Sequence, residues 1–215
     1  MRGWAETGDR IVLVGAGRFA EEITDLAADA GVVIAAWIEG LQPARANAAH
    51  MPPIVWVDDQ AGFEPGLSIA PAIGSVRRRA LVERLVAEGR SLATIVHPSA
   101  VIARTAILEL GCVVFPNVVI GARARIGGGT IVNRGALIGH HVTIGTGSFV
   151  GPGANIGGGV VVGEEAHIGI GAVVRDDRRI GARATIGAGA VAVADVDPDT
   201  TVVGVPARPI GDRGS

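Results

Sequence analysis

Aliphatic residues recur at every sixth position through the second half of the chain. The series has seventeen unbroken members: Val96, Ile102, Leu108, Val114, Ile120, Ile126, Val132, Ile138, Ile144, Val150, Ile156, Val162, Ile168, Val174, Ile180, Ile186 and Ala192. A period of six matches neither an α-helix nor an alternating β-strand, so it indicates a repeat architecture. The pattern predicts a hexapeptide β-helix, in which three short strands close a triangular coil of about eighteen residues. Residues 96–192 should then form about five coils.

The positions that flank each aliphatic residue support this architecture. The residue two places earlier is small in most repeats, as at Ala124 and Ala154, and Arg178 is the clear exception. Glycine directly follows the aliphatic residue in ten repeats, the first being Gly121 and the last Gly187. We expect a tight turn there, in which a side chain would cause strain.

The first half of the chain follows a different pattern. An apolar run at 11–14 predicts a buried strand, and a helical pattern after it ends at Gly31. The other predicted elements are strands at 32–38, 54–57, 67–73 and 92–96, a helix at about 76–89, and a proline-containing loop at 41–53. We therefore predict a small, doubly wound, Rossmann-like α/β domain over residues 1–95 and a β-helix with a C-terminal tail over residues 96–215.

A nucleotide-binding pattern lies between the first predicted strand and helix. Gly15 and Gly17 belong to a G-x-G-x-x-A sequence, and Glu39 ends the next strand. Such glycines let the backbone approach a phosphate at a helix N-terminus, and a carboxylate at this place can accept a hydrogen bond from a ribose hydroxyl. An NAD-dependent oxidoreductase would need a second half-domain and a catalytic domain, which the β-helix does not supply. Binding of one nucleotide or a nucleotide-linked substrate is favoured, and glycines that merely shape a turn are the alternative.

Composition excludes several other classes of protein. A formal net charge of −2 gives no electrostatic footprint for nucleic acid or an acidic membrane surface. Cys112 is the single cysteine, so it cannot form an internal disulfide, and its place in the small-residue column predicts a packing role. The polar N-terminal segment does not resemble a signal peptide, and no apolar run has the length of a membrane span. We expect a cytoplasmic protein.

Three histidines of the repeat are candidates for chemistry. His140 and His141 follow Gly139 on the turn side of a predicted strand, and His167 lies on another side of the triangle. Metal ligands must converge within about 2.1 Å of one ion, whereas adjacent histidines on an extended strand diverge, so no metal is expected. One imidazole beside a cleft suffices as a general base for an amine or hydroxyl that attacks an acyl donor. An ordinary surface histidine is the alternative.

Four segments together resemble one family. They are the Gly-Ala-Gly unit, VHPSA at 96–100, IGHHVTIG at 138–145 and VGVPAR at 203–208. The chain resembles, over residues 10–210, the sialic-acid O-acetyltransferase-like and nucleotide-sugar N-acetyltransferase family. This resemblance implies a left-handed β-helix, a homotrimer, acetyl-CoA as co-substrate, and an N-terminal domain that binds the nucleotide of an amino sugar.

The resemblance also implies roles for individual residues. His140 falls at the general base that takes a proton from the attacking amine. The family's acidic residue after the base is His141 here, and the residue before it is Gly139. The imidazole therefore lacks an obvious carboxylate partner. Either a side chain from an adjacent coil or subunit orients it, with Asn133 as the best local candidate by resemblance, or the imidazole is less basic.

Further residues match the family's substrate-binding positions. Those for acetyl-CoA are Phe149, Gly169, Ile170, Gly187, Ala188 and Arg208. Those for the nucleotide sugar are Gly15, Gly17, Arg18, Glu39, Gly74 and Ser75. Arg18 could pair with a phosphate or fill the nucleotide's space, and Arg208 could pair with a CoA phosphate or be a solvated surface cation.

The resulting functional hypothesis is transfer of an acetyl group from acetyl-CoA to the amino group of a nucleotide-linked amino sugar. Two alternatives are acetylation of a sugar hydroxyl, which the same base would serve, and a non-catalytic subunit that binds nucleotide as a scaffold. One substrate groove at each subunit interface makes a threefold ring the natural assembly.

Overall fold

The structure is a computed structural model that describes residues 4–6, 8–40, 52–58, 66–74 and 78–210. The chain divides into two compact units. The first comprises residues 1–98 and 110–113, and the second comprises residues 99–109 and 114–215. None of the described helices is both long enough and apolar enough to cross a membrane.

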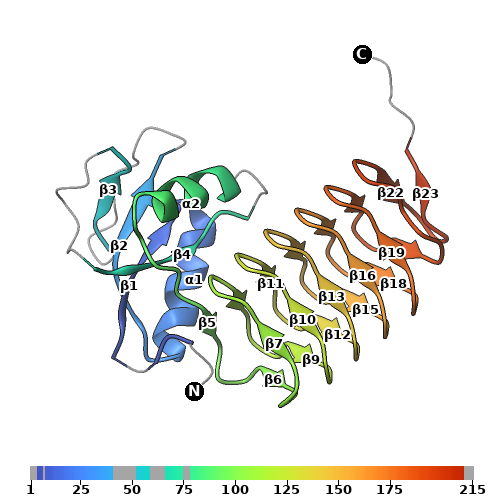
Figure 1. Cartoon of the computed structure of the whole chain (residues 1–215), viewed down its shortest axis with the longest axis horizontal. Helices are drawn as coiled ribbons and strands as arrows, with labels where there is room; N and C mark the ends of the chain where they lie inside the picture. Colours follow the sequence, from blue (N-terminus) through green and yellow to red (C-terminus); the bar gives the residue numbers. More distant parts are fainter. Residues whose placement is uncertain (1–3, 7, 41–51, 59–65, 75–77, 211–215) are drawn as a thin grey trace. The chain divides into compact units, whose positions relative to one another are not determined.

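The first unit contains a four-stranded parallel sheet and two helices (Figure 1). The strand order is β3-β2-β1-β4. Their bounds are β1 (Arg10–Val14), β2 (Val33–Glu39), β3 (Ile54–Trp56) and β4 (Ser68–Pro71), with α1 (Arg18–Asp29) and α2 (Arg78–Ala87). These agree with the predicted strands and helices to within a few residues, and the predicted loop at 41–53 lies almost entirely outside the described residues.

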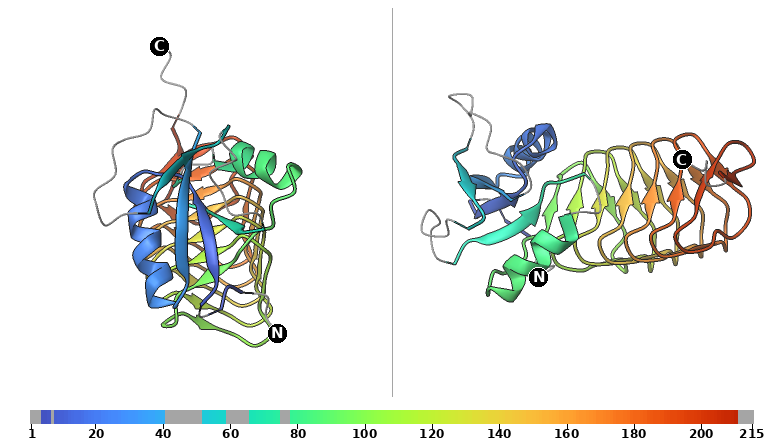
Figure 2. Two further views of the ribbon diagram at one scale, coloured as in Figure 1. Left: turned by 90° about the vertical axis from the view of Figure 1, so that its left-hand side faces the viewer. Right: turned by 90° about the horizontal axis from the view of Figure 1, so that it is seen from above.

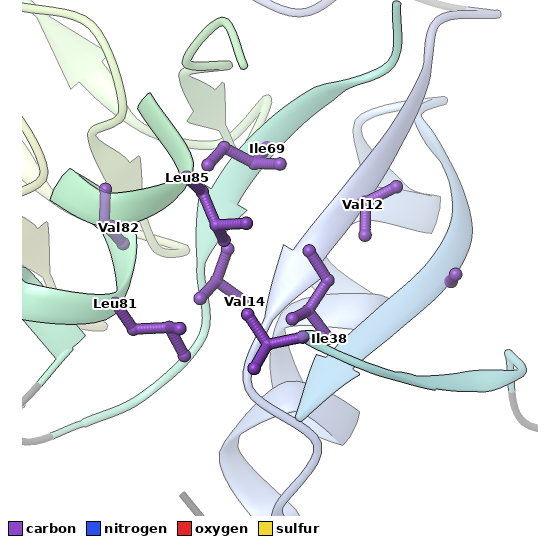
Figure 3. Close-up of a cluster of buried hydrophobic side chains, with 9 residues drawn as sticks. Val12, Val14, Ile38, Ile69, Leu81, Val82 and Leu85 are labelled. Carbon is purple, nitrogen blue, oxygen red and sulfur yellow. The ribbon is translucent and has the colours of Figure 1, made fainter. Parts of the chain in front are cut away.

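The two helices cover opposite faces of this sheet (Figure 2). Successive strand residues point to opposite faces, so Val12 and Val14 pack with Leu85 of α2 in one apolar cluster (Figure 3). On the α1 side, the Trp37 Nε1–H donates to Thr24 Oγ1 at 3.1 Å. Both faces are therefore buried, which explains why the strands are almost continuously apolar.

The predicted strand at 92–96 is wrong as a single element. Leu92 forms one isolated parallel bridge with Ile69 of β4. Residues 95 and 96 form a separate strand, β5 (Ile95–Val96), which belongs to a sheet of the β-helix. Ala93 and Thr94 between them are buried and belong to neither strand. The Ala93 N–H donates to the Ile69 carbonyl at 2.8 Å, and the Thr94 carbonyl accepts from the Ala5 N–H at 2.8 Å. One apolar run is thus divided between two sheets.

From residue 95 onward the chain forms a parallel β-helix with three faces (Figure 1). Face 1 contains β6 (Val101–Ile102), β9 (Val119–Ile120), β12 (Leu137–Ile138), β15 (Asn155–Ile156), β18 (Val173–Val174) and β21 (Val191–Ala192). Face 2 contains β7 (Ile107–Leu108), β10 (Arg125–Ile126), β13 (Thr143–Ile144), β16 (Val161–Val162) and β19 (Arg179–Ile180). Face 3 contains β5, β8 (Val113–Val114), β11 (Ile131–Val132), β14 (Phe149–Val150), β17 (His167–Ile168), β20 (Thr185–Ile186), β22 (Thr201–Val203) and the antiparallel β23 (Arg208–Pro209).

The repeat prediction is confirmed at the level of single residues. Residues eighteen apart pair in register, as Leu137 does with Asn155, and the coils stack along one axis (Figure 2). Every aliphatic residue of the series from Val114 to Ala192 is buried. Three turns complete each coil. We call the turn from face 1 to face 2 corner A, and the turn from face 3 to face 1 corner B.

The glycines after the aliphatic residues have a different cause from the one expected. The turn residues with positive φ lie two positions later, as at His141 with φ 58°. The glycines are needed because successive coils approach closely there. A β-carbon on Gly121 would lie 2.7 Å from the backbone nitrogen of His140, and one on Gly139 would lie 2.7 Å from that of Gly158.

Candidate functional site

The two adjacent histidines lie on corner A, directly after β12. Both side chains are exposed. The His141 backbone N–H donates to the Ala122 carbonyl at 2.9 Å, and the Gly159 N–H donates to the His140 carbonyl at 2.9 Å. These bonds to the coils on either side fix the backbone from which both imidazoles project. His141 adopts the left-handed conformation, which histidine tolerates better than most residues.

The imidazole rings contact one another edge to face. The two Nδ1 atoms are 3.1 Å apart, the ring centroids are 5.2 Å apart, and the ring planes meet at 85°. Since a hydrogen bond at this distance needs one donor and one acceptor, one of the two Nδ1 atoms carries a proton and the other presents a lone pair. The tautomer of each ring therefore constrains that of its neighbour.

Gly158 provides the space in which the His140 ring lies. It occupies the same place as His140 one coil later in the chain. A β-carbon on Gly158 would lie 2.7 Å from Cε1 and 2.8 Å from Nε2 of His140. Any side chain at position 158 would therefore displace the imidazole, because atoms at that separation overlap.

Two aspartates occupy the same places one coil beyond the glycines. Asp176 Oδ1 accepts a hydrogen bond from the Gly158 N–H at 2.6 Å, and the Asp177 carboxylate lies against Gly159. The histidines, glycines and aspartates line one pocket of about 390 Å³: His140, His141, Gly158, Gly159, Asp176 and Asp177. Asp176 and Asp177 were not singled out from the sequence. Their spacing could have identified them, since each follows its histidine by thirty-six residues, which is two coils.

Asn133, the sequence candidate for orienting His140, lies at corner B. Its side chain is 3% exposed, and its Oδ1 accepts a hydrogen bond from the Arg134 N–H at 2.7 Å. It does not line the pocket around His140. Within this chain the structure thus does not bring Asn133 and His140 together, because consecutive corners project from different edges of the triangle.

The residues matched to acetyl-CoA binding lie around face 3 and corner B. Gly169 and Ala188 approach closely, since a β-carbon on Gly169 would lie 2.7 Å from the Ala188 nitrogen. Ile170 beside them is 62% exposed. The Phe149 ring stacks on His167 with centroids 4.9 Å apart. Gly187 also lies on corner B, and the exposed Arg208 lies on β23, where its guanidinium donates to the Ala207 carbonyl at 2.9 Å.

The nucleotide-sugar candidates gather at one edge of the sheet in the first unit. Gly15 follows β1, Glu39 ends β2, and Gly74 follows β4, so parallel pairing brings all three to the carboxyl edge. Gly15 has φ 129°, and a β-carbon there would lie 2.7 Å from the Ile73 side chain. Ser75 lies outside the described residues.

Gly17 precedes α1, whose first turn has no side-chain cap, and Arg18 is exposed at its first position. Glu39 Oε1 accepts a hydrogen bond from the Gly40 N–H at 2.8 Å. A hollow of about 250 Å³ in this unit lies at the opposite edge, beside Arg10, Ile11 and Ser68. In the part of the chain that the structure describes, no group of three histidine, cysteine or acidic residues could hold a metal ion.

Comparison with known proteins gives structural matches over nearly the whole chain. One is a variant of perosamine N-acetyltransferase from Caulobacter crescentus, with one histidine replaced by asparagine, in complex with CoA and GDP-perosamine. It has 34% sequence identity and a TM-score of 0.87, covering 97% of this chain and 100% of that chain. No protein-family model matches the sequence, and a search of curated proteins finds no match.

Two further solved structures are similar. The acetyltransferase domain of PglB from Neisseria gonorrhoeae FA1090, in complex with acetyl coenzyme A, shares 30% identity at a TM-score of 0.86, covering 94% of this chain and all of that chain. WeeI from Acinetobacter baumannii AYE shares 26% identity at a TM-score of 0.82, with the same coverage. With these neighbours, the second unit matches the left-handed parallel β-helix that the resemblance implied.

Proposed function

Because this chain belongs to the hexapeptide-repeat nucleotide-sugar acetyltransferases, we propose that it transfers the acetyl group of acetyl-CoA to the amino group of a nucleotide-linked amino sugar. The chain is an acetyltransferase, as its structural neighbours are. A neighbour in complex with CoA and GDP-perosamine supports this pair of substrates. The observation that carries the proposal is the His140 imidazole, which lies in an open pocket over a glycine that leaves room for it.

We assign His140 as the general base. If its Nδ1–H donates to His141 Nδ1, the lone pair of His140 lies on Nε2, beside Gly158 in the pocket. That nitrogen can take the proton of an amine placed in the pocket. His141 then fixes the tautomer of the base by accepting the Nδ1–H, a role that a carboxylate often fills.

The overall exchange balances with one base. Acetyl-CoA supplies a thioester carbonyl, at which the amine nitrogen forms a C–N bond while the C–S bond breaks. His140 takes the proton that the amine loses and returns it to the departing sulfur, so the products are an amide and the CoA thiol. No covalent link to the protein is needed.

We assign the acetyl-CoA groove to corner B and face 3, around Phe149, Gly169, Ile170, Gly187, Ala188 and Arg208. Exposed Ile170 offers an apolar surface, and exposed Arg208 can pair with a phosphate. The His140 pocket lies on corner A of the same chain. A site completed by corner B of a neighbouring copy joins the two sets of residues, which favours a homotrimer.

A second observation supports this assembly. Four outward positions of face 1, which connects corner B to corner A, carry exposed apolar side chains: Val101 at 64%, Val119 at 40%, Leu137 at 44% and Val173 at 36% exposure. The exposed Asn155 interrupts the row between Leu137 and Val173. Exposed apolar side chains gathered on one face are typical of surfaces that another chain covers. A threefold ring would cover these side chains in every copy.

We assign the first unit, approximately residues 1–95, as a Rossmann-like domain that holds the nucleotide. Its parallel sheet with a helix on each face brings Gly15, Gly17, Arg18, Glu39 and Gly74 to the carboxyl edge. Glycine-rich turns before an uncapped helix suit a phosphate, and Glu39 suits a ribose hydroxyl. The identity of the nucleotide is left to experiment.

The proposal is tested by an assay of thiol release from acetyl-CoA with a panel of UDP-, GDP- and dTDP-linked amino sugars. We expect one or a few amino sugars to support turnover. The matched control for each acceptor is the same nucleotide sugar with a hydroxyl in place of the amine. Turnover only with hydroxyl acceptors would replace N-acetylation with O-acetylation, and no thiol release with any acceptor, together with no acetyl-CoA binding by calorimetry, would reject the enzyme.

A further inference from the structure

His140, Gly158 and Asp176 form one column on corner A. They occupy equivalent places in three successive coils. Neighbouring strands lie about 4.8 Å apart, so the first and last members of the column are separated by roughly 10 Å of backbone. Gly158, between them, has no side chain to occupy that space. The pocket is therefore open along the column from the imidazole to the carboxylate.

The two side chains converge on Gly158 from opposite directions. From one side, His140 Nε2 comes within 2.8 Å of the point where a β-carbon would stand. From the other side, Asp176 Oδ1 accepts the Gly158 N–H at 2.6 Å. The hydrogen bond holds the carboxylate toward the histidine side of the column. The nitrogen that faces the pocket thus has a fixed negative group beyond the glycine.

The His140–His141 pair alone supplies no negative charge for the product of proton transfer. Once His140 has taken a proton it is a cation, and its ring neighbour His141 is neutral or a second cation, which would repel it. A carboxylate in the same pocket favours the charged imidazole. Asp176 is in line with His140, whereas Asp177 stands in the neighbouring column behind His141 and Gly159.

The backbone around Asp176 is anchored by a residue that breaks the small-residue column. The Arg178 Nε–H donates to the Asp176 carbonyl at 3.2 Å, and its guanidinium lies 3.6 Å from the Asp195 carboxylate. Arg178 thus holds the main chain of this corner, and the ion pair that the structure describes for it is with Asp195. The Asp176 carboxylate stays oriented toward Gly158.

From this geometry we propose that Asp176 is the positioning carboxylate of His140: across Gly158, it stabilises the imidazolium that forms when His140 takes the proton of the acceptor amine. The inference rests on the proposed acetyl transfer and on His140 as its base. It supplies from two coils away the negative charge that the residue after the base, His141, lacks.

The test is Asp176→Asn, studied by steady-state kinetics in the full-length protein. Asparagine keeps an oxygen that can accept the Gly158 N–H, so the backbone contact survives and only the charge is removed. We expect kcat to fall about 10- to 100-fold, with the calorimetric Kd for acetyl-CoA unchanged and the acceptor KM within about threefold. Introduced together with His140→Asn, the substitution should cause no further loss, since the charge acts through that imidazole.

The matched control is Glu109→Gln. Glu109 Oε2 also accepts a glycine N–H of the next coil, from Gly128 at 2.8 Å, but it does not line the pocket. Its kcat should stay within about twofold of the wild type. If kcat fell as much in Glu109→Gln as in Asp176→Asn, the loss would come from disturbed packing of the coils and not from the charge beside His140. That result would overturn the proposal.

Three other results would also overturn it. An unchanged kcat in Asp176→Asn would mean that the charge is not used. A raised acceptor KM with unchanged kcat would make the carboxylate a binding group for the acceptor's ammonium. A loss that persists undiminished in the His140→Asn background would separate Asp176 from the base. Wild-type protein with no acetyl transfer to any acceptor would instead refute the proposed function itself, so the two failures are distinguishable.

Discussion

The two units of this chain bring functional groups together in different ways. In the β-helix, residues eighteen apart stack, so the neighbours of His140 can be counted along the sequence as Gly158 and Asp176. In the first unit, Gly15, Glu39 and Gly74 come from the ends of three strands at unequal spacings. A substitution in the β-helix should therefore act on one column of side chains, whereas one at the sheet edge should act on a single contact with substrate.

The largest effect is expected for His140→Asn. Removal of the general base should lower kcat by about 10² to 10⁴ while acetyl-CoA binding, measured by calorimetry, survives. His141→Asn is the matched control, since asparagine also tolerates the positive φ of that position. We expect the control to lose about tenfold in kcat, because only the partner that fixes the tautomer is removed. A severe loss in His141→Asn with a harmless His140→Asn would exchange the two assignments.

A smaller effect is expected for Gly158→Ala. The new methyl group would overlap Cε1 and Nε2 of His140 and turn the ring out of the pocket, which should lower kcat by about 10- to 100-fold. Alanine occupies the equivalent place two coils earlier, at Ala122, so the fold should tolerate it. The free energy of unfolding, from denaturant titration, should change by less than about 0.5 kcal/mol because an exposed ring can rotate away.

The control for Gly158→Ala is the same change in a His140→Ala background. With no ring to displace, the methyl group should cause no further loss of kcat. Equal losses of kcat in both backgrounds would show that Gly158 is needed for the backbone conformation and not to make room for the imidazole. The stacking of His140, Gly158 and Asp176 would then have no role in catalysis.

The sequence predicted the β-helix well because its energetic requirement repeats. Each coil must bury an aliphatic residue at the same place, and a period of six has no competing interpretation. The reason for the glycine after each aliphatic residue is harder to predict from the sequence. Close approach of Gly139 to the backbone of the next coil depends on how coils stack, which local turn preferences do not describe. The position of Asp176 has a related cause, since it lies thirty-six residues from His140 and enters the same pocket only through the stacking of the coils.

The first unit was predicted less sharply because its strands depend on tertiary pairing. The apolar run at 92–96 has one pattern, yet Leu92 bridges to Ile69 and Ile95 joins face 3 of the β-helix. Hydrophobicity alone cannot divide such a run between two sheets. The position of Glu39 at the end of β2, in contrast, followed from the strand and turn pattern, because parallel strands present their carboxyl ends at one edge.

The smallest effect is expected for Glu39→Ala in the first unit. Loss of one charged acceptor for a ribose hydroxyl should raise the KM for the nucleotide sugar by about tenfold, with kcat and the KM for acetyl-CoA nearly unchanged. Glu39→Gln is the matched variant: its amide oxygen can still accept the Gly40 N–H, so it preserves the local turn and removes the charge. If Glu39→Gln retains wild-type KM while Glu39→Ala does not, a neutral acceptor oxygen suffices at this position and the negative charge is not used. A rise in the KM for acetyl-CoA alone would place Glu39 in the acetyl-CoA site. The two units would then no longer differ in the way proposed, with the His140 column acting on the chemical step and the sheet edge of the first unit acting on nucleotide-sugar binding.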